Sequence, residues 1–510
     1  MSDWSGGYVT DVLYTPGYYS PLNPLIMQLA LTRAGVVAPT VGTACELGIG
    51  RGVSLNAHAT ASVTRWYGND FIPAQLGFAR SLAEQARSDA RLFEEDFATF
   101  CARTDLPDFD FIALHGVWSW IDERNREVLV DFLRRRLRTG GVVYISYNTT
   151  PGWATFAPMR EILREHGEVM SAPGQGTEAR VREALGFAER LLAVQPGYAE
   201  VNPEVHDRLG MLQQQDSGYL AHEYFNRDWH PMPFSRVAEQ LRPARLEFAC
   251  SAHLPDHFDA INLTPAHRQL LGEIGEKHFR QTVRDFLVNQ SFRRDHWVRG
   301  ARELSSSERL EALRRIRVVL ISPRQEIPLT VRGSLGEATM SEAIYAPVLE
   351  ALADYRPHTL GELEHTLAGR VRQEQLEYAV VLLAGAGHLC PAQAPDTIEQ
   401  ALPGCRRLNA TLLQRARSHH DTPWLASPVT GGAVMVPRFD QLFLLARERG
   451  ERDPRQWAAL AWQILEARQQ RVVREGAPLE DEADNLAELH RQACHFEAVR
   501  LPVLQALQVA

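Results

Sequence analysis

The sequence is poor in cysteine. It has 6 cysteines in 510 residues, and no two of them form a C-x-x-C pair. A disulfide scaffold is therefore excluded, and neither a zinc knuckle nor a redox motif is indicated. Because so few thiols in so long a chain fit a reducing compartment, we expect the protein in the cytoplasm. The positions are Cys45, Cys101, Cys250, Cys390, Cys405 and Cys494.

Long apolar runs and an excess of positive charge are also missing. No stretch reaches the ~18 consecutive apolar residues of a membrane span, and the first residues lack the basic start and apolar core of a signal peptide. Lys and Arg number 54 against 63 Asp and Glu, which gives a net charge of −9. The lack of a long apolar run predicts that the chain has no membrane span. Because a nucleic-acid binder carries a concentrated basic field, we also expect no nucleic-acid partner.

What is present is the composition of a large globular protein. Hydrophobic residues make up 45% and charged residues 23%, which suffices for several conventional cores. At ~150 residues per domain, the chain length predicts two to four domains. Composition shifts and turn clusters divide the chain into a lead segment (1–40), an α/β domain (41–155), a mostly helical middle domain (156–335), a winged-helix-like domain (336–400) and a C-terminal helical region (401–510).

Short β-rich runs alternate with helix-length segments between residues 41 and 150. This alternation predicts parallel βαβ units in a doubly wound, Rossmann-like α/β sheet. Such sheets bind ligands beyond the carboxyl ends of their strands, so we expect the site residues there. The expected strands are 43–49, 64–70, 90–97, 109–117 and 141–148, and the main expected helices are 73–88 and 126–139.

A glycine-rich loop follows the first expected strand. It runs from Glu46 to Gly52 as ELGIGRG, and glycines at such a turn let the backbone approach a bound nucleotide. Val53 stands where a G-x-G-x-x-G dinucleotide fingerprint needs its third glycine, although a Rossmann oxidoreductase stays open as the nearest enzyme alternative. With an acid two residues before the first glycine, the spacing resembles motif I of class I S-adenosylmethionine methyltransferases.

Further polar side chains stand at the ends of the following strands. Asp70 ends the second, where a carboxylate can accept hydrogen bonds from both ribose hydroxyls of a nucleotide. Asp96 ends the third beside Phe97, and the methyltransferase pattern implies that this pair contacts the adenine. The expected site for S-adenosyl-L-methionine therefore comprises Glu46, Gly48, Gly50, Gly52, Asp70, Asp96, Phe97 and His115.

Several longer segments resemble one family of methyltransferases. HGVWSWI and SYNTTPGW, together with YLAHEYFNRDWHPMPF and NQSFRRDHWVRG, are similar to segments of the bacterial protein-lysine methyltransferases that carry a methyltransferase regulatory domain. The resemblance covers nearly the whole chain. It implies a Rossmann-like catalytic domain, a regulatory middle domain and a winged-helix C-terminal domain. It also implies protein lysine side chains as acceptors, for which a surface-exposed protein is one source. Asn69 departs from the pattern, because an apolar residue usually precedes the acid, but Asp70 is kept.

Methyl transfer to an amine sets the requirements for the acceptor side. It is an in-line displacement that needs a neutral amine, and positioning alone supplies roughly 7–11 kcal/mol of barrier reduction. Because a lysine amine titrates near ~10.4, its site must favour the neutral form. The candidates for orienting the amine or relaying its proton are Tyr147, Asn148 and His115. The candidate aromatic wall, which would hold the amine by cation–π contact, comprises Tyr18, Tyr19, Trp118 and Trp120.

Structural alternatives stand beside these functional interpretations. A tryptophan at a strand end is commonly part of the core, and Tyr18 and Tyr19 lie in a proline-rich segment that can pack as a simple arm. His419, His420 and Asp421 are neighbours on a loop and rarely converge on one ion. His222-Glu223 lacks the second histidine of H-E-x-x-H, because Asn226 stands there, so no metal is expected.

Three questions stay open at the level of the sequence. A small-molecule N- or O-methyltransferase and a non-catalytic S-adenosylmethionine-binding interaction protein are alternatives to a protein-lysine methyltransferase. The winged-helix-like module lacks a lysine- and arginine-rich recognition helix, so contact with protein is favoured over contact with DNA. The acceptor, the number of methyl groups and the oligomeric state, a homodimer included, are not assigned.

Overall fold

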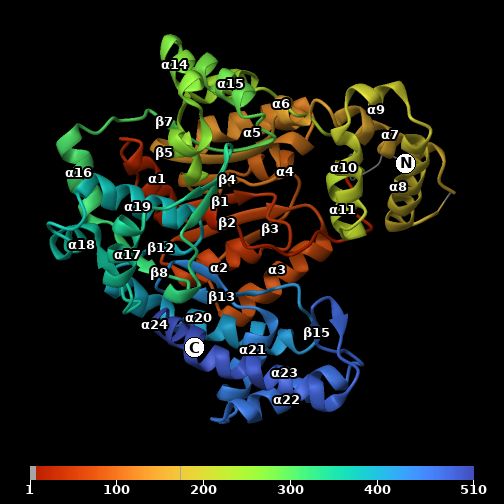
Figure 1. The fold of residues 1–510 in the computed structure, drawn as a ribbon. Helices are drawn as coiled ribbons and strands as arrows, with labels where there is room; N and C mark the ends of the chain where they lie inside the picture. Colours follow the sequence, from red (N-terminus) through yellow and green to blue (C-terminus); the bar gives the residue numbers. More distant parts are fainter. Residues whose placement is uncertain (1–6, 173) are drawn as a thin grey trace.

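A sheet of seven strands in the order β3-β2-β1-β4-β5-β7-β6 forms the centre of the molecule. The computed structural model describes residues 7–172 and 174–510, so the first six residues of the lead segment lie outside it (Figure 1). The strands β1 to β5 are parallel to one another, whereas β7 is antiparallel to both β5 and β6. The predicted α/β class is confirmed. The strands are β1 (Thr43–Leu47), β2 (Arg65–Asp70), β3 (Arg91–Glu94), β4 (Phe109–Leu114), β5 (Leu137–Asn148), β6 (Leu246–Ser251) and β7 (Phe292–Arg299).

The sheet extends beyond the domain boundary expected at residue 155. Its strands β6 and β7 come from the stretch predicted to be a separate middle domain. The sequence hides β7 because half of its residues, FRRDHWVR, are charged, and only the structure shows that Arg293 and Asp295 are buried as a pair. The seven-stranded sheet is therefore built from both the α/β region and the middle region of the chain.

Two faces of the sheet are covered by different helices, because side chains of successive strand residues alternate between faces. Val143, Ile145 and Tyr147 of β5 pack into the core that holds α4 (Phe97–Ala102), α5 (Glu123–Arg136) and α12 (Phe234–Leu241). Val142 and Tyr144 point to the other face and join a second core. That core includes residues of α1 (Pro24–Arg33), α2 (Val53–Ala61) and α3 (Pro73–Ala86).

A helical lobe is inserted between β5 and β6 and has a hydrophobic core of its own, with Phe156, Leu163 and Val181 at its centre. In Figure 1 it projects to the right of the sheet. Its helices are α6 (Thr150–Trp153), α7 (Ala157–Val169), α8 (Thr177–Ala193), α9 (Gly197–Val201), α10 (Glu204–Leu212) and α11 (Ser217–Tyr224). Between β6 and β7 the chain adds α13 (Asp259–Asn262), α14 (Pro265–Glu273) and α15 (Lys277–Leu287).

The next module is built on a three-stranded antiparallel sheet in the order β11-β8-β12. Its strands β9 and β10 are followed by three helices and the terminal strand β12, and the central strand β8 precedes the expected boundary at residue 336. Its assignment as a winged helix stays a prediction. The elements are α16 (Ser306–Arg315), β8 (Arg317–Leu320), β9 (Thr330–Gly333), β10 (Gly336–Thr339), α17 (Glu342–Ala351), β11 (His358–Thr359), α18 (Leu360–Thr366), α19 (Gln373–Gly385) and β12 (Leu389–Ala392).

The C-terminal region is helical, as expected, and contains one hairpin. Its hairpin is formed by β13 (Trp424–Ser427) and β14 (Gly432–Met435), because apolar runs flank the Thr430-Gly431 turn. None of the helices seen in residues 7–172 and 174–510 has the length and apolarity that crossing a membrane requires. The remaining elements are α20 (Pro395–Ala416), α21 (Arg438–Glu448), α22 (Pro454–Glu466), β15 (Val473–Arg474), β16 (Ala477–Pro478), α23 (Glu482–His495) and α24 (Leu501–Ala506).

Candidate functional site

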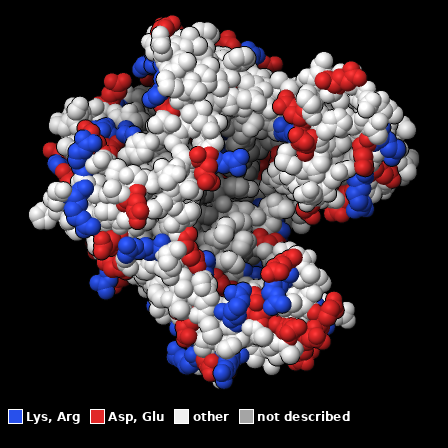
Figure 2. Space-filling view, viewed as in Figure 1, with Lys and Arg blue, Asp and Glu red and all other residues white. Residues whose placement is uncertain are grey.

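A cavity of about 570 Å³ lies at the carboxyl ends of β1, β2, β4 and β5, where the topology predicts a ligand site. One side is formed by the glycine loop and the strand ends. The other side is formed by the N-terminal segment around residues 7–19 and by α11 of the helical lobe. Figure 2 shows that this face of the molecule is hollowed beside the lobe. The cavity is thus closed between the sheet and elements far away in the sequence.

The glycine loop has the backbone geometry that the motif predicts. Gly48 and Gly52 have φ values of +71° and +63°, in the left-handed region where side chains are strained. A Cβ at Gly52 would lie 2.6 Å from the Cβ of Ala79, so the close approach of the loop to α3 also requires glycine. Gly50 donates its backbone N–H to Asp70 Oδ2 at 2.8 Å, which ties the loop to the end of β2.

Two buried carboxyl groups face the cavity beside this loop. Burial, together with the charge of Asp70, raises the pKa of Glu46 to about 8. Glu46 Oε2 has no hydrogen-bond partner among the residues that the structure describes. Burial raises the pKa of Asp70 to about 6, although the N–H groups of Ile72 and Gly50 donate to its two oxygens and oppose the shift. A buried acid without a cation is a site for a ligand that carries positive charge.

Asp96 and Phe97 both line the cavity, as predicted, but not as the end of a strand. Strand β3 ends at Glu94, and Asp96 is the N-cap of α4, with Oδ1 accepting from Thr99 N at 2.7 Å. Its other carboxylate oxygen is not used in the cap. The pair therefore lies where a purine edge and face can be contacted, and its adenine role stays a prediction.

His115 lines the cavity between two tyrosines. Its Nδ1 lies 2.9 Å from the hydroxyl of Tyr144, and its ring stacks on Tyr19 with centroids 3.8 Å apart. Burial, together with the charge of Arg294, lowers the pKa of His115 to about 3. The imidazole is therefore neutral at physiological pH. It is suited to holding Tyr19 in place and is a poor acceptor for a relayed proton.

Asn148 also lines the cavity, and its backbone is fixed on both sides. Its N–H donates to Ser119 Oγ at 2.9 Å, and its carbonyl oxygen accepts from Met232 N at 3.0 Å. The side-chain Nδ2 is buried and has no partner within residues 7–172 and 174–510. This amide is therefore available to a ligand, which agrees with its predicted role without testing it.

Three of the predicted acceptor contacts are wrong in placement: Tyr147, Trp118 and Tyr18 do not line the cavity. Tyr147 points to the opposite face of β5 from Asn148, because adjacent strand residues alternate, and its hydroxyl donates to Asp295 Oδ2 at 2.8 Å. Trp118 is fully buried in the core under α5. Trp120 and Tyr19, in contrast, do line the cavity.

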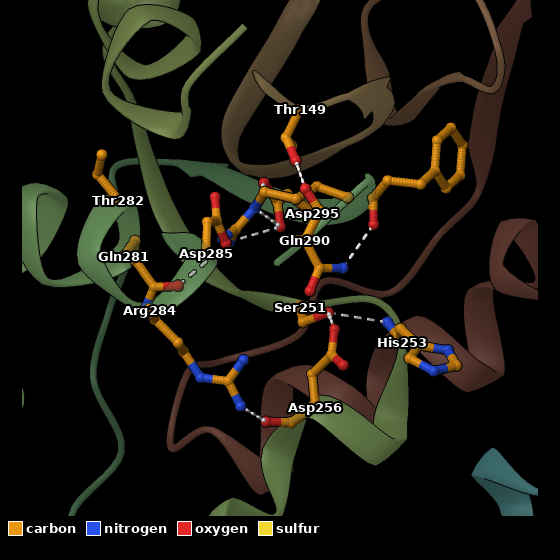
Figure 3. Close-up of polar contacts among 12 residues, drawn as sticks. Thr149, Ser251, His253, Asp256, Gln281, Thr282, Arg284, Asp285, Gln290 and Asp295 are labelled. Atoms are coloured by element: carbon orange, nitrogen blue, oxygen red, sulfur yellow. Dashed lines mark hydrogen bonds and ion pairs between the residues drawn. The ribbon is translucent and has the colours of Figure 1, made fainter. Parts of the chain in front are cut away.

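Tyr18 is a structural residue. Its ring packs 5.2 Å from that of His58, and its hydroxyl is hydrogen bonded with the backbone of Ala433 in the C-terminal hairpin. Tyr147 belongs to a buried polar network beneath the cavity. Figure 3 shows its partner Asp295 beside Asp285, with Thr149 at the end of β5 bonded to the carbonyl oxygen of Gln290. This network fixes the strand end that carries Asn148.

Two family models match the chain. The family described as "methyltransferase domain" matches residues 45–145, and the family described as "predicted methyltransferase regulatory domain" matches residues 216–299. The uncharacterised protein sll1526 from Synechocystis is 38% identical over 513 residues, which cover 99% of this chain and 100% of that protein. The chain belongs to the class I methyltransferases that carry a methyltransferase regulatory domain. This confirms the family predicted from the motifs.

Solved structures share the fold of this methyltransferase over almost its whole length. The structure of PKMT2 from Rickettsia typhi in complex with AdoHcy is 18% identical, with a TM-score of 0.69, and the match covers 97% of this chain and 99% of that one. A second structure of PKMT2 from Rickettsia typhi is 17% identical, with a TM-score of 0.67 and the same coverage. The shared fold thus includes the helical lobe and the C-terminal region.

The regulatory-domain match explains the residues that the sequence analysis missed. It begins at the start of α11, whose Tyr219, His222 and Glu223 line the cavity of the methyltransferase. Tyr8 and Tyr14 of the N-terminal segment line it as well. The available clue was the family-like segment YLAHEYFN, in which His222 and Glu223 were set aside because H-E-x-x-H is incomplete.

No group of three His, Cys, Asp or Glu side chains is placed to hold a metal ion in the part of the methyltransferase that the structure describes. Asp421, beside His419 and His420, instead pairs with Arg415 at 2.7 Å and Arg51 at 3.4 Å. His222 Nε2 lies 2.9 Å from the carbonyl oxygen of Val12 and fastens the N-terminal segment to α11. His222 and Asp421 therefore have structural partners.

Proposed function

We propose that this methyltransferase methylates lysine side chains of a protein and that it does so in the cytoplasm. As a class I methyltransferase it uses S-adenosylmethionine. The observation that carries the protein substrate is the extent of the fold match to PKMT2, which covers 97% of this chain. A small acceptor needs far less recognition surface than the lobe, the module of residues 306–392 and the C-terminal region supply, and their retention supports a macromolecular substrate.

The cavity fits the proposed cofactor by its charge and its shape. The two buried acids, Glu46 and Asp70, have raised pKa values, and neither forms an ion pair with a residue that the structure describes, so a ligand with positively charged groups relieves an unfavourable arrangement. Asp96 and Phe97 supply an acceptor and an apolar ring at the far end of the glycine loop. When bound, S-adenosylmethionine supplies an electrophilic methyl group.

The protein's own residues position the acceptor. Asn148 offers an unpartnered amide, and Trp120 and Tyr19 offer aromatic surface to an ammonium group or its methylated products. The N-terminal segment covers the cavity through the contact between Val9 N and Asn226 Oδ1, at 2.8 Å. Positioning a neutral amine in such an enclosed cavity supplies most of what an in-line transfer needs.

Transfer of labelled methyl groups to a cell lysate tests the substrate. We expect label in protein, in acid-stable form on lysine. Label found solely in the low-mass extract would instead establish a small-molecule methyltransferase. If the protein binds S-adenosylmethionine but labels nothing, the interaction-protein alternative stands.

The cofactor site is tested by Asp70→Asn, which keeps the size of the side chain but removes its charge. Hydrogen bonds to charged groups are worth about 1.5–3 kcal/mol, so we expect S-adenosylmethionine affinity to fall by about 10- to 150-fold in calorimetry. The matched control is Asp89→Asn, an exposed acid on the loop before β3, which should bind as wild type does. Equal affinity for wild type and Asp70→Asn would remove Asp70 from the site.

A further inference from the structure

A carboxylate surrounded by tyrosines lies on the side of the cavity that faces the glycine loop. Glu223, on α11, is half-buried, and it lines the cavity. Its Oε1 accepts a hydrogen bond from the Tyr14 hydroxyl at 3.1 Å. No Lys, Arg or His among residues 7–172 and 174–510 forms an ion pair with it. The hydrogen bond from one phenol does not neutralise the charge of the carboxylate, so Glu223 can still take a positively charged partner.

Four tyrosines lie within electrostatic reach of this carboxylate. The charge of Glu223 contributes to a raised pKa of the hydroxyls of Tyr8, Tyr14, Tyr19 and Tyr219, after burial as the main cause for each. Tyr219 precedes Glu223 by one helical turn and so shares its face of α11. The rings of Tyr8 and Tyr14 both pack against His222, at centroid distances of 5.5 and 5.1 Å. We name this cluster, Tyr8, Tyr14, Tyr19, Tyr219 and Glu223, the tyrosine–glutamate cage.

The cage is joined to the cofactor side of the cavity. All five members of the cage line the same cavity as Glu46 and Asp70, and the ring of Tyr8 lies 5.8 Å from that of Phe71, the residue after Asp70. Tyr19 is tied to the start of α2, because its N–H donates to Ser54 Oγ at 2.7 Å. A group held in the cage lies next to whatever occupies the glycine-loop side, which is the arrangement that a transfer reaction requires.

The charges around Glu223 favour a cationic ligand. The acids Glu46 and Asp70 share the cavity with it, whereas Arg51 and Arg227, which also line the cavity, pair with Asp421 at 3.4 Å and with Asp228 at 3.5 Å. The cation that acts on Glu223 electrostatically is Arg160. That guanidinium is committed elsewhere, because it donates to the carbonyl oxygen of Asn226 at 2.7 Å and stacks over Trp229. Burial raises the pKa of Glu223, although the Tyr14 hydroxyl and Arg160 oppose the shift. An unpaired acid among aromatic faces matches an alkylammonium group.

We propose that the tyrosine–glutamate cage is the acceptor site of this methyltransferase and that it receives the primary ammonium group of a lysine side chain, with Glu223 as its counter-ion and proton acceptor. This deepens the proposed function and rests on it. One proton moves from the ammonium nitrogen to a carboxylate oxygen of Glu223, which leaves a neutral amine and a carboxylic acid. The lone pair freed in this way is the nucleophile, and Glu223 returns the proton to solvent after release of the product.

The aromatic members of the cage have a separate task. Their faces attract the ammonium substrate and also its methylated forms, which keep their positive charge and gain apolar surface. An alcohol or a thiol acceptor gains nothing from such a cage before the reaction. The cage therefore selects amines over other nucleophiles, and it selects by charge as well as by shape.

Ligand binding without cofactor tests the proposal apart from activity. The probes are N-α-acetyl-lysine amide and N-α-acetyl-norleucine amide, which differ by the ammonium group, and binding is followed by saturation-transfer NMR at pH 7. We expect wild type to prefer the lysine probe at least tenfold. Glu223→Gln should abolish that preference, and Glu200→Gln, an exposed acid on α9 of the same lobe, should retain it. Equal binding of the two probes by wild type, or an unchanged preference in Glu223→Gln, overturns the proposal.

Kinetics on labelled protein separate this proposal from the proposed function. Glu223→Gln should raise KM for the protein and lower kcat, with the affinity for S-adenosylmethionine within twofold of wild type. Glu223→Asp, which withdraws the carboxylate by one methylene, is the second variant and should retain part of the preference for the lysine probe. If wild type labels no protein, the proposed function fails. If wild type labels protein and both Glu223 variants match it in probe preference and KM, the cage alone fails.

Discussion

At the scale of single residues, burial changes the protonation state of Glu46. Its pKa is raised to about 8, so the unliganded protein holds it protonated at neutral pH. The raised pKa also fixes the sign of its effect on stability. Because the unfolded chain ionises near the ordinary value of 4.5 and the folded one near 8, this group's contribution to stability falls as the pH rises between these values.

The same shift predicts that S-adenosylmethionine binding releases a proton. A cationic ligand favours the ionised form of Glu46, so affinity should rise with pH, by up to about tenfold per unit, and level off above the pKa. Calorimetry at pH 7 in two buffers of different ionisation enthalpy measures the protons released. Glu46→Gln should remove this proton release, and the titration of the ligand's own amino group, which persists in the variant, is the internal control. Identical proton release by both proteins would contradict the assignment.

At the scale of elements, the sequence predicts those strands whose buried side chains are apolar. Apolar runs in the sequence predict β1, β4 and the end of β5 directly. The glycine-rich motif likewise predicts the loop between β1 and α2. Strand β7 escaped because Arg293 is buried between Asp285 at 2.6 Å and Asp295 at 2.9 Å, a balance of charges that no periodicity in one segment reveals. The sequence did not predict the part of the cavity formed by α11 and the N-terminal segment either, because these elements meet the sheet through tertiary contacts between distant parts of the chain.

Tyr147 and Asn148 form a matched pair, since they are neighbours on β5 whose side chains face opposite ways. Asn148→Ala should lower kcat on labelled protein by tenfold or more with little change in stability, because its amide faces the cavity. Tyr147→Phe removes a hydrogen bond to the buried Asp295 and should destabilise the protein by about 1–3 kcal/mol. Its kcat should stay within twofold of wild type.

Thermal unfolding followed by circular dichroism, together with single-turnover kinetics, separates these two effects. A large loss of kcat in Tyr147→Phe at a temperature where it is fully folded would place its hydroxyl in the reaction, against the geometry. Wild-type kcat in Asn148→Ala would move the acceptor contacts to the tyrosine–glutamate cage alone.

At the scale of the whole molecule, the C-terminal region is part of the catalytic fold. Val53, Ala61 and Leu82 of α2 and α3 share one core with residues of α20 to α24. Hydrogen bonds cross the same interface, from Asn23 Nδ2 to the carbonyl oxygen of Thr430 at 2.8 Å and from Gln393 Nε2 to that of Ala61 at 2.7 Å. The sequence could not show this packing, because apolar helix faces do not name their partners. It explains why Tyr18, which was predicted to line the acceptor site, instead lies in the interface between the sheet domain and the C-terminal hairpin.

This interface can be tested at the close contact between Gly432 and Tyr18. A Cβ added at Gly432 would collide with the hydroxyl oxygen of Tyr18, which is held by hydrogen bonds to the backbone of Ala433 and to Asn23. Gly432→Ala should therefore destabilise the protein by about 1–3 kcal/mol, the usual cost of overpacking. Tyr18→Phe removes the atom that collides, so the double variant should be more stable than the sum of the single changes predicts, with a coupling of at least about 0.5 kcal/mol. Unfolding midpoints of the four proteins measure this cycle. Additive effects would show that the hairpin is not seated on the methyltransferase sheet through Tyr18, whereas the expected coupling, with S-adenosylmethionine affinity unchanged in Tyr18→Phe, confines this residue to the interface.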